Sequence, residues 1–274
     1  MPAETRQVTV LSRVSSPFAF GSGRARFLIE RNVYVYRRTY MTLVSGFFEP
    51  LFYLLAMGFG LGVLVGQVPG PDGRDISYTV FIAPALLAAS AMNGAIYDST
   101  FNVFFKLNYE KVYNAVLATP LGVGDVALGE IIWALIRGQL YAIGFMGVVL
   151  LLGLMPSAWG LLAVPASVLL GFAAAGLGMA ATSFMKTWQD LDLVQLVVLP
   201  VFLFSGTFYP LSVYPEPLHT IVQFSPLYRG TDLIRRLMTG ALDPVMLLDL
   251  GYLALLGMVG LAIVSRRLDK LLLK

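Results

Sequence analysis

The most constraining feature of this sequence is a series of long apolar segments separated by short polar breaks. A helix needs about 20 apolar residues to cross a bilayer, and only helices and closed barrels satisfy all their backbone groups in lipid. Six apolar segments suit this purpose, although the fifth is short. They cover residues 41–65, 76–105, 126–154, 159–185, 193–208 and 244–264. The pattern predicts an all-α, polytopic membrane protein with six transmembrane helices.

The composition agrees with this class and excludes several kinds of chemistry. Hydrophobic residues make up 57% of the chain and charged residues 13%, whereas a soluble domain averages about 25% charged. Cysteine is absent and His219 is the only histidine, so no disulfide framework, thiol nucleophile or histidine-rich metal site is expected. Residues 1–40 lack a clean apolar core, so the first span is expected to serve as its own insertion signal.

The most polar interruption in the first half of the chain lies between the second and third spans. Its apolar side chains recur at helical spacing and form one stripe: Tyr109, Val112, Tyr113, Val116 and Leu117. Lys106, Glu110 and Lys111 lie off the stripe, and Lys106 and Glu110 have the spacing of an ion pair. We expect one amphipathic helix over residues 106–118. Either it passes movement from outside the membrane to the spans, or it only ties two spans together.

The N-terminal region divides into two parts. Residues 1–23 are polar and are expected to form a mobile tail. Residues 24–40 place an apolar stripe of Ile29, Val33, Tyr36 and Tyr40 beside the arginines Arg24, Arg31, Arg37 and Arg38. This pattern is typical of a basic helix that lies in the headgroup plane, with an ordinary juxtamembrane segment as the alternative.

A second irregular region, residues 209–243, is neither a span nor a soluble domain. Four prolines break it, and residues 218–224 and 227–238 can each form a short helix. In the second helix Leu227, Ile234 and Leu237 form an apolar face, and Arg229, Arg235 and Arg236 form the polar one. Together with Tyr228, these arginines are the candidate site residues of the region. We expect two half-length, re-entrant helices protected by surrounding protein, with a plain surface loop carrying interfacial helices as the alternative.

The distribution of Lys and Arg predicts the orientation. If both ends of the chain are cytoplasmic, fourteen of these residues lie in cytoplasmic segments and four lie outside. Cytoplasmic loops carry the positive excess in membrane proteins. The prediction therefore puts the 106–118 helix and the C-terminal tail, residues 269–274, in the cytoplasm and the broken region outside.

Ionisable residues within the spans are the best candidates for functional side chains, because charge in a membrane is costly. They are Glu49, Asp98, Glu130, Arg137 and Asp249. Glu130 and Arg137 are about 10 Å apart along one helix face, so each is expected to have a partner on another helix, either for packing or for transport. Glu49, Asp98 and Asp249 are nearer span ends, where we expect them to reach water.

Sequence motifs for enzyme chemistry are absent. The chain contains no G-x-x-x-x-G-K-[ST], G-x-S-x-G or H-E-x-x-H motif, so no catalytic, cofactor-binding or metal-binding residue is predicted. Gly58, Gly62 and Gly66 repeat every fourth residue, a pattern that allows close helix packing within one subunit or between two.

Three segments carry a resemblance to a known family: EPLFYLLAMGFGLG (49–62), YEKVYNAVLATPLGVGDVALGEIIWALIRG (109–138) and FLFSGTFYPLSVYPEPLHTIVQFSPLYRGTDLIRRL (202–237). Over residues 24–268 the chain resembles the permease subunits of ABC type-2 exporters. It is most similar to the NodJ-like branch, named for the nodulation lipo-oligosaccharide exporter.

The resemblance implies a bacterial plasma-membrane permease domain over residues 24–268 and a set of partners. Two permease subunits would pair, as a homodimer more readily than as a heterodimer, above two cytoplasmic ATPase subunits that bind MgATP. The 106–118 helix would couple to the ATPase, the 24–40 helix would be the interface helix, and residues 209–240 would cap the exit path. The substrate would be a glycolipid, a lipid-linked saccharide or a hydrophobic drug, and nucleic acid plays no part.

Two other functions remain open from the residues. A secondary transporter would use Glu130, Arg137 and Asp249 as a proton relay and would need no ATPase. A lipid-modifying enzyme would need a polar cluster near one interface, and residues 228–236 are the only candidate.

Overall fold

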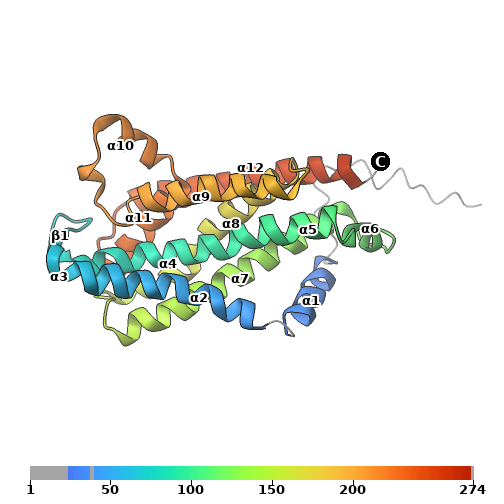
Figure 1. Cartoon of the computed structure of the whole chain (residues 1–274). Coiled ribbons are helices and arrows are strands. Elements are labelled where there is room, and N and C mark those ends of the chain that lie inside the picture. The colour runs from blue at the N-terminus through green and yellow to red at the C-terminus, as the bar shows by residue number, and fades with distance from the viewer. Residues whose placement is uncertain (1–23, 38–39, 273–274) are drawn as a thin grey trace, which may run out of the picture.

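A computed structural model describes residues 24–37 and 40–272 of the chain. Predictions that fall on residues 1–23, 38–39 and 273–274, among them the polar tail and Arg38, lie outside the described residues. The helices run alongside one another and form an elongated bundle (Figure 1). One end of the bundle carries α1, α5 and α6 and is called the α6 end. The opposite end carries α3, the strands and α10 and is called the α10 end.

The elements of the bundle follow one another along the chain with short connections. In chain order they are α1 (Ala25–Tyr36), α2 (Tyr40–Tyr53), the π-helix η2 (Leu54–Leu61), α3 (Gly62–Val65), β1 (Gln67–Pro69), β2 (Asp75–Ser77), α4 (Tyr78–Tyr97), the π-helix η3 (Asp98–Asn102), α5 (Val103–Asn108), α6 (Val112–Leu117), α7 (Val123–Leu151), the 3₁₀ turn η4 (Ala158–Leu162), α8 (Ala163–Thr182), the 3₁₀ turn η5 (Trp188–Leu191), α9 (Asp192–Phe204), the 3₁₀ turn η6 (Leu211–Val213), α10 (Glu216–Gln223), α11 (Pro226–Thr239) and α12 (Val245–Leu272).

Within the described residues, five helical runs are long and apolar enough to cross a membrane. They are Phe48–Val65, Tyr78–Asn108, Val123–Leu151, Ala158–Thr182 and Val245–Leu272. These runs match five of the six predicted spans to within a few residues at most boundaries, although α12 continues to Leu272. The all-helical, multi-span prediction is therefore confirmed at this level.

The predicted fifth span corresponds to α9, which is shorter than the others. Its 13 residues rise only about 20 Å, and the turn η5 precedes it. Figure 1 shows α9 running between the two ends of the bundle. The helices α1 and α6 and the end of α12 all lie at the α6 end (Figure 1).

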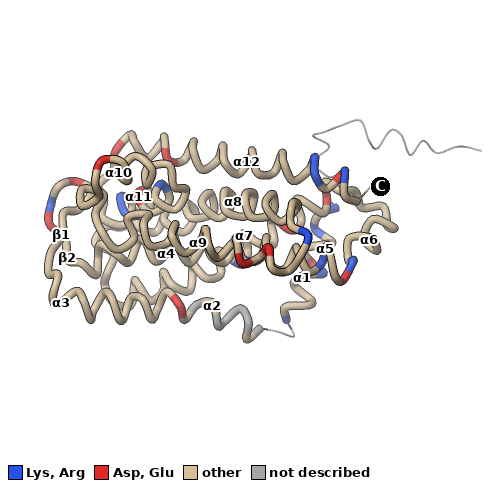
Figure 2. Tube along the Cα trace, turned by 45° about the horizontal axis from the view of Figure 1, so that its top comes forward, with Lys and Arg blue, Asp and Glu red and all other residues tan. Residues whose placement is uncertain are grey.

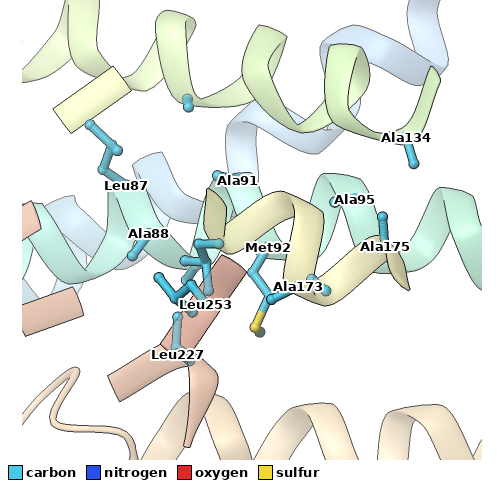
Figure 3. Packing of buried hydrophobic residues seen from close by; sticks show 14 of the residues in the cluster. Leu87, Ala88, Ala91, Met92, Ala95, Ala134, Ala173, Ala175, Leu227 and Leu253 are labelled. Carbon is cyan, nitrogen blue, oxygen red and sulfur yellow. The ribbon is translucent and has the colours of Figure 1, made fainter. Parts of the chain in front are cut away.

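The core of the bundle is built around α4. Fifteen of the twenty residues of α4 are buried, and it packs against α7, α8 and α11. Figure 3 shows Ala91, Met92 and Ala95 of α4 facing alanines of α7 and α8. Small side chains let the backbones come close: a Cβ added to Gly138 of α7 would lie 2.5 Å from the carbonyl oxygen of Ala91. This tight contact makes α4 and α7 one unit.

The first span is irregular after Pro50, where the helix widens into the π-helix η2. Gly58 and Gly62 of the predicted glycine repeat pack against Thr79 at the start of α4, within the same chain. Gly66 has a positive φ of 75° and ends α3, so it terminates the helix and does not extend the repeat. Residues 67–77 form a small antiparallel hairpin in which Val68 pairs with Ile76.

The broken region between α9 and α12 contains two helices, as predicted, but they differ in burial. Ser225 caps α11 and Gly240, at a φ of 81°, ends it. One face of α11 is buried against α4, α8 and α12, including the predicted Leu227, Ile234 and Leu237. In contrast, α10 projects from the end of the bundle (Figure 1). Only α11 therefore re-enters the bundle.

Charged side chains gather at the two ends of the bundle, and the long middle of each helix is largely without them (Figure 2). Within the described residues, Glu49 on α2 and three buried ion pairs lie on or between the long helices: Lys106–Glu130, Arg137–Asp98 and Arg229–Asp249. These pairs are the best-defined polar features of the bundle, and two of them lie towards the α6 end.

Candidate functional site

The predicted coupling segment is two helices and not one. The run that begins as α4 ends at Asn108, and α6 begins only at Val112. Lys111 between them has a φ of 53°, the left-handed conformation that interrupts a helix. The predicted ion pair between Lys106 and Glu110 is therefore wrong, because Lys106 turns inward and contacts Glu130 of α7 instead.

The break divides the predicted apolar stripe into an outer and an inner part. Tyr109 is 57% exposed, and Glu110 and Lys111 are exposed with it. The inner part comprises Tyr113, which is 1% exposed, and the half-buried side chains Val112, Val116 and Leu117. The segment thus offers one surface to the outside and fixes itself to the bundle with another.

A buried polar cluster lies directly behind α6, and we call it the Glu130 cluster: Asn32, Lys106, Tyr113 and Glu130. Lys106 Nζ lies 2.8 Å from Glu130 Oε2, and both side chains are almost completely buried. Asn32 of α1 donates from Nδ2 to the same Glu130 oxygen at 3.2 Å and accepts from Lys106 through Oδ1 at 3.2 Å. One carboxylate therefore joins α1, α5 and α7.

Tyr113 brings α6 into the same cluster. Its hydroxyl lies beside the Glu130 carboxylate without a well-aligned hydrogen bond in the described part of the chain. Burial, and then the negative charge of Glu130, raises the pKa of Tyr113 well above its ordinary value. A tyrosine hydroxyl is protonated at physiological pH in any case, so this shift matters only in alkaline solution.

Helix α1 packs against α7 through a face that the sequence did not predict. Its buried residues are Ala25, Leu28 and Asn32, whereas Val33 of the predicted stripe is 43% exposed. Contact is close because α7 has Gly129 here: an added Cβ would lie 2.9 Å from Cβ of Leu28. The predicted helix over residues 24–40 also ends earlier, at Tyr36.

The predicted interface arginines differ in their surroundings. Arg24 donates from Nη1 to the carbonyl oxygen of Pro120 at 2.8 Å, which joins the start of α1 to the loop after α6. Arg31 donates to Oδ1 of Asn32 at 3.3 Å, at the edge of the Glu130 cluster. Arg37 is exposed at the end of α1. The α1 and α6 segments are therefore linked to each other as well as to the spans.

A second buried cluster, called the Asp98 cluster, lies further into the bundle: Tyr36, Asp98, Asn102, Arg137 and Tyr141. Arg137 Nη1 contacts Asp98 Oδ1 at 2.9 Å, and its Nε donates to the Tyr141 hydroxyl at 3.1 Å. The Tyr36 hydroxyl donates to Asp98 at 3.2 Å and accepts from Asn102. Asn102 also bonds Asp98, across the π-helix η3.

These clusters confirm one prediction about the intramembrane charges and correct another. Glu130 and Arg137 do have partners on other helices, namely Lys106 and Asp98. Asp98 and Asp249 were expected to reach water, but both are completely buried. A buried carboxylate keeps its charge only with a paired cation and hydrogen bonds, and the neighbouring helices supply these.

The third buried ion pair lies near the α10 end. Arg229 Nη1 contacts Asp249 Oδ1 of α12 at 3.0 Å and bonds the carbonyl oxygen of Gln223 through Nε at 2.8 Å. Arg236 pairs with Asp232 at 2.7 Å. Arg229 thus holds α11 against α12, whereas the Arg236–Asp232 pair lies within α11 itself.

Arg235 was predicted on the polar face of α11, but it is only 5% exposed. Its guanidinium bonds the carbonyl oxygens of Phe81 and Gly206 and lies over the Phe81 ring at 3.8 Å. Tyr228, on the same helix, packs against Gly206. Arg229 and Arg235 are thus occupied by contacts that fix α11 in the bundle.

Sequence reasoning missed five members of the clusters as site residues: Asn32, Tyr36, Asn102, Lys106 and Tyr141. Asn102 and Lys106 follow Asp98 at four-residue intervals, which places three polar side chains near one another at the end of an apolar run. That spacing could have indicated an inward-facing polar patch. Nothing in the sequence around Asn32 reveals that it faces Glu130, 98 positions away.

The fold and these clusters define a multi-pass membrane protein in which two short end helices are joined to the spans through buried ion pairs. The chain belongs to the ABC-2 type transporter family, whose model matches residues 24–239. It is a permease subunit, a transport subunit without a catalytic domain. Permeases of this family pair with nucleotide-binding subunits.

Relatives of this chain share its length as well as its sequence. Nodulation protein J of Rhizobium leguminosarum bv. trifolii is 35% identical over 215 residues, which cover 75% of this chain and 80% of that protein. The protein of the same name from Rhizobium leguminosarum bv. viciae is 32% identical, covering 85% and 93%. That of Neorhizobium galegae is 31% identical, covering 87% and 94%.

Proposed function

We propose that this permease subunit moves an amphipathic molecule outward across the plasma membrane, driven by ATP hydrolysis in a cytoplasmic partner. The observation that carries the proposal is the division of residues 109–117 into an exposed surface and a buried anchor. An exposed surface on a flexible loop could bind a partner without moving the spans. A surface whose reverse side reaches a buried ion pair between spans can transmit force.

The direction of transport follows from the orientation that the basic residues predict. Both termini and α6 would lie in the cytoplasm, and α10 and the hairpin would lie outside. The common position of α1, α6 and the end of α12 at one end of the bundle supports this arrangement (Figure 1). The ATPase would then meet α6 and the loop bonded to Arg24.

Movement of α6 would pass to the spans through the two buried clusters. Tyr113 and Lys106 connect α6 and α5 to Glu130 of α7, and Tyr36 connects α1 to Asp98 and Arg137. Because α4 and α7 are in close backbone contact, they move as one body. Closure of the ATPase dimer would tilt this body and open a path between two permease copies.

The exposed side of α2 is the proposed contact for a lipid-like substrate or a second copy of the chain. Phe48 and Phe52 stack at 6.0 Å and are 44% and 61% exposed. Tyr53 packs inward against Phe202, and the side chain of Phe47 lies outside the described residues. Contact of the exposed phenylalanines with ordinary bilayer lipid is the alternative.

A proton-coupled transporter is the second function considered, and the pairing of charges argues against it. Its relay residues Glu130, Arg137 and Asp249 belong to three different ion pairs with three different partners. A proton relay needs groups that exchange protons with one another, whereas these groups neutralise a partner next to them.

The test uses the exposed surface alone, so that the anchor stays intact. Tyr109→Asp with Ala115→Asp should abolish co-purification with the ATPase subunit and lower substrate-stimulated ATP hydrolysis at least tenfold, because a buried interface tolerates unpaired charge poorly. Tyr209→Asp is the matched control, since Tyr209 is also 57% exposed but lies towards the α10 end. Unchanged assembly and hydrolysis in the Tyr109 variant would show that α6 is not the coupling helix.

A further inference from the structure

A cavity with a mostly apolar wall and a few polar groups lies between α2, α4, α7 and α9, next to the Asp98 cluster. Its volume is about 100 Å³, and Glu49, Ser90, Asn93 and Arg137 are among the side chains that line it. That volume suits a small polar group and excludes a whole amphipathic molecule. The question is which group its side chains would bind.

Two buried polar atoms in the wall lack partners in the described part of the chain. Ser90 is 3% exposed, and its Oγ makes no hydrogen bond. A helical serine in an apolar setting usually bonds a backbone carbonyl of the preceding turn, as Ser99 does with Ile96 at 3.1 Å. Asn93, one turn after Ser90, has an Oδ1 that is also unsatisfied. Because an unmade hydrogen bond is costly, both atoms favour a polar occupant. The amide oxygen of Asn93 needs a donor, and the hydroxyl of Ser90 can accept from the same donor group or donate to it.

The carboxylate of Glu49 is a third hydrogen-bond acceptor in the wall of the cavity. Glu49 forms no ion pair among the residues that the structure describes, whereas the Arg137 guanidinium is already matched by Asp98 at 2.9 Å. Glu49 is itself exposed, and when its carboxylate is ionised it gives the cavity a net negative charge. An anionic group would be repelled, and an uncharged one would leave the carboxylate uncompensated.

Aromatic rings complete the wall and favour the same kind of occupant. Tyr53, Tyr97 and Phe202 also line the cavity. The faces of such rings attract cations, most strongly where water is excluded. Acceptor atoms, an unpaired carboxylate and aromatic faces together are complementary to an ammonium group.

We propose that this cavity binds the primary ammonium group of an amphipathic amine, with Glu49, Ser90 and Asn93 as its acceptors. A primary ammonium carries three N–H donors, which equals the number of these acceptors. Its source is either the cargo or an aminophospholipid of the bilayer. The proposal goes beyond the export function and does not depend on the ATPase partner.

The experiment compares three probes with the same tail: octylammonium, octyltrimethylammonium and octyl β-glucoside. Binding to the full chain in phosphatidylcholine nanodiscs is measured at neutral pH, after subtraction of partition into empty nanodiscs. Octylammonium should bind at least tenfold more tightly than the other two, because only it supplies both charge and donors. Equal or tighter binding of the glucoside would overturn the proposal.

Variants of the wall test the assigned acceptors. Glu49→Gln should weaken octylammonium binding about tenfold or more and Ser90→Ala about fivefold, while leaving the glucoside unaffected. Ser99→Ala is the control, because its hydroxyl already bonds a carbonyl outside the cavity. If neither wall variant changes the affinity, the cavity holds only water. If Glu49→Gln does not fold, the octylammonium affinity of Ser90→Ala alone tests the proposal.

A last measurement shows whether the bound ammonium group comes from the cargo or from a lipid of the bilayer. Addition of phosphatidylethanolamine to the nanodiscs should displace octylammonium if the occupant is a bilayer lipid and should leave it bound if the occupant is cargo. Both results support the ammonium site. Because no nucleotide or partner is present, failure of this binding would leave the coupling role of α6 untouched.

Discussion

Lys106 Nζ and Glu130 Oε2 lie 2.8 Å apart in a site that both side chains share with Asn32 and that is closed to solvent. The pair joins the end of the α4–α5 run to α7 at the level where α6 begins. A buried pair of this kind contributes little net stability compared with a well-packed apolar pair, but loss of one partner leaves an unpaired buried charge. The pair therefore serves mainly to fix the position of α5 relative to α7.

The first prediction concerns this pair. Lys106→Met should lower the free energy of unfolding by about 3–5 kcal/mol, and the double variant with Glu130→Leu should recover most of that loss. The measurement is a denaturant titration of the purified protein. Arg74→Met provides the control, because the Arg74–Asp72 pair is exposed and its loss should cost about 1 kcal/mol or less. A double variant as unstable as the single one would contradict the assignment.

The second prediction concerns the hydroxyl of Tyr36, which bonds Asp98, Asn102 and Arg137. Tyr36→Phe removes these bonds but keeps the ring, which packs against Trp133 at 5.1 Å. We expect a loss of about 1–3 kcal/mol in the free energy of unfolding and weaker coupling of ATP hydrolysis to substrate. Tyr34→Phe, two positions earlier and 70% exposed, should change neither quantity. Equal behaviour of the two variants would refute the role of the hydroxyl.

Much of the bundle could be predicted from the sequence because apolar length is a local property. The runs now seen as α4–α5, α7 and α12 are evident without knowledge of their neighbours. The two re-entrant candidates were also evident, because prolines define them. Tertiary contact decided which one enters the bundle, since α11 buries one face against three helices and α10 does not.

The candidate site was predicted less well, for a physical reason. Helical periodicity assumes a continuous helix, and the left-handed residue Lys111 breaks the register between Tyr109 and Val112. Sequence spacing also favoured Glu110 as the partner of Lys106, because it considers only neighbours along the chain. The true partner, Glu130, is 24 positions away and becomes available only when α7 packs beside α5.

The third prediction tests the contact between α1 and α7. Gly129→Ala places a Cβ 2.9 Å from Cβ of Leu28, so α1 should be displaced and the protein destabilised by about 1–3 kcal/mol. Gly147→Ala on the same helix is the matched control, because an added Cβ there meets nothing within 4 Å. It should be neutral or stabilising by up to about 1 kcal/mol through helix propensity. Thermal unfolding of both variants measures the difference, and equal melting temperatures would show that α1 does not depend on this contact.

The fourth prediction concerns pH and the buried hydroxyl of Tyr113. Burial and Glu130 raise the pKa of Tyr113 in the folded state, whereas in the unfolded state the pKa is about 10. The unfolded chain therefore releases this proton at a lower pH than the folded one. The contribution to stability is complete below pH 10 or so and decreases as the pH rises above it, by about 1.4 kcal/mol per pH unit.

Tyr113→Phe isolates this effect from that of the other tyrosines. Unfolding free energies of wild type and variant are measured between about pH 8 and pH 11.5, and the difference between them is plotted against pH. Below pH 10 the difference should be constant, and above it wild type should lose stability faster than the variant, because phenylalanine has no proton to release. Tyr109→Phe is the control, since Tyr109 is exposed and its replacement should leave the slope unchanged. Parallel curves for wild type and Tyr113→Phe would mean that this hydroxyl is not held in the buried cluster beside Glu130.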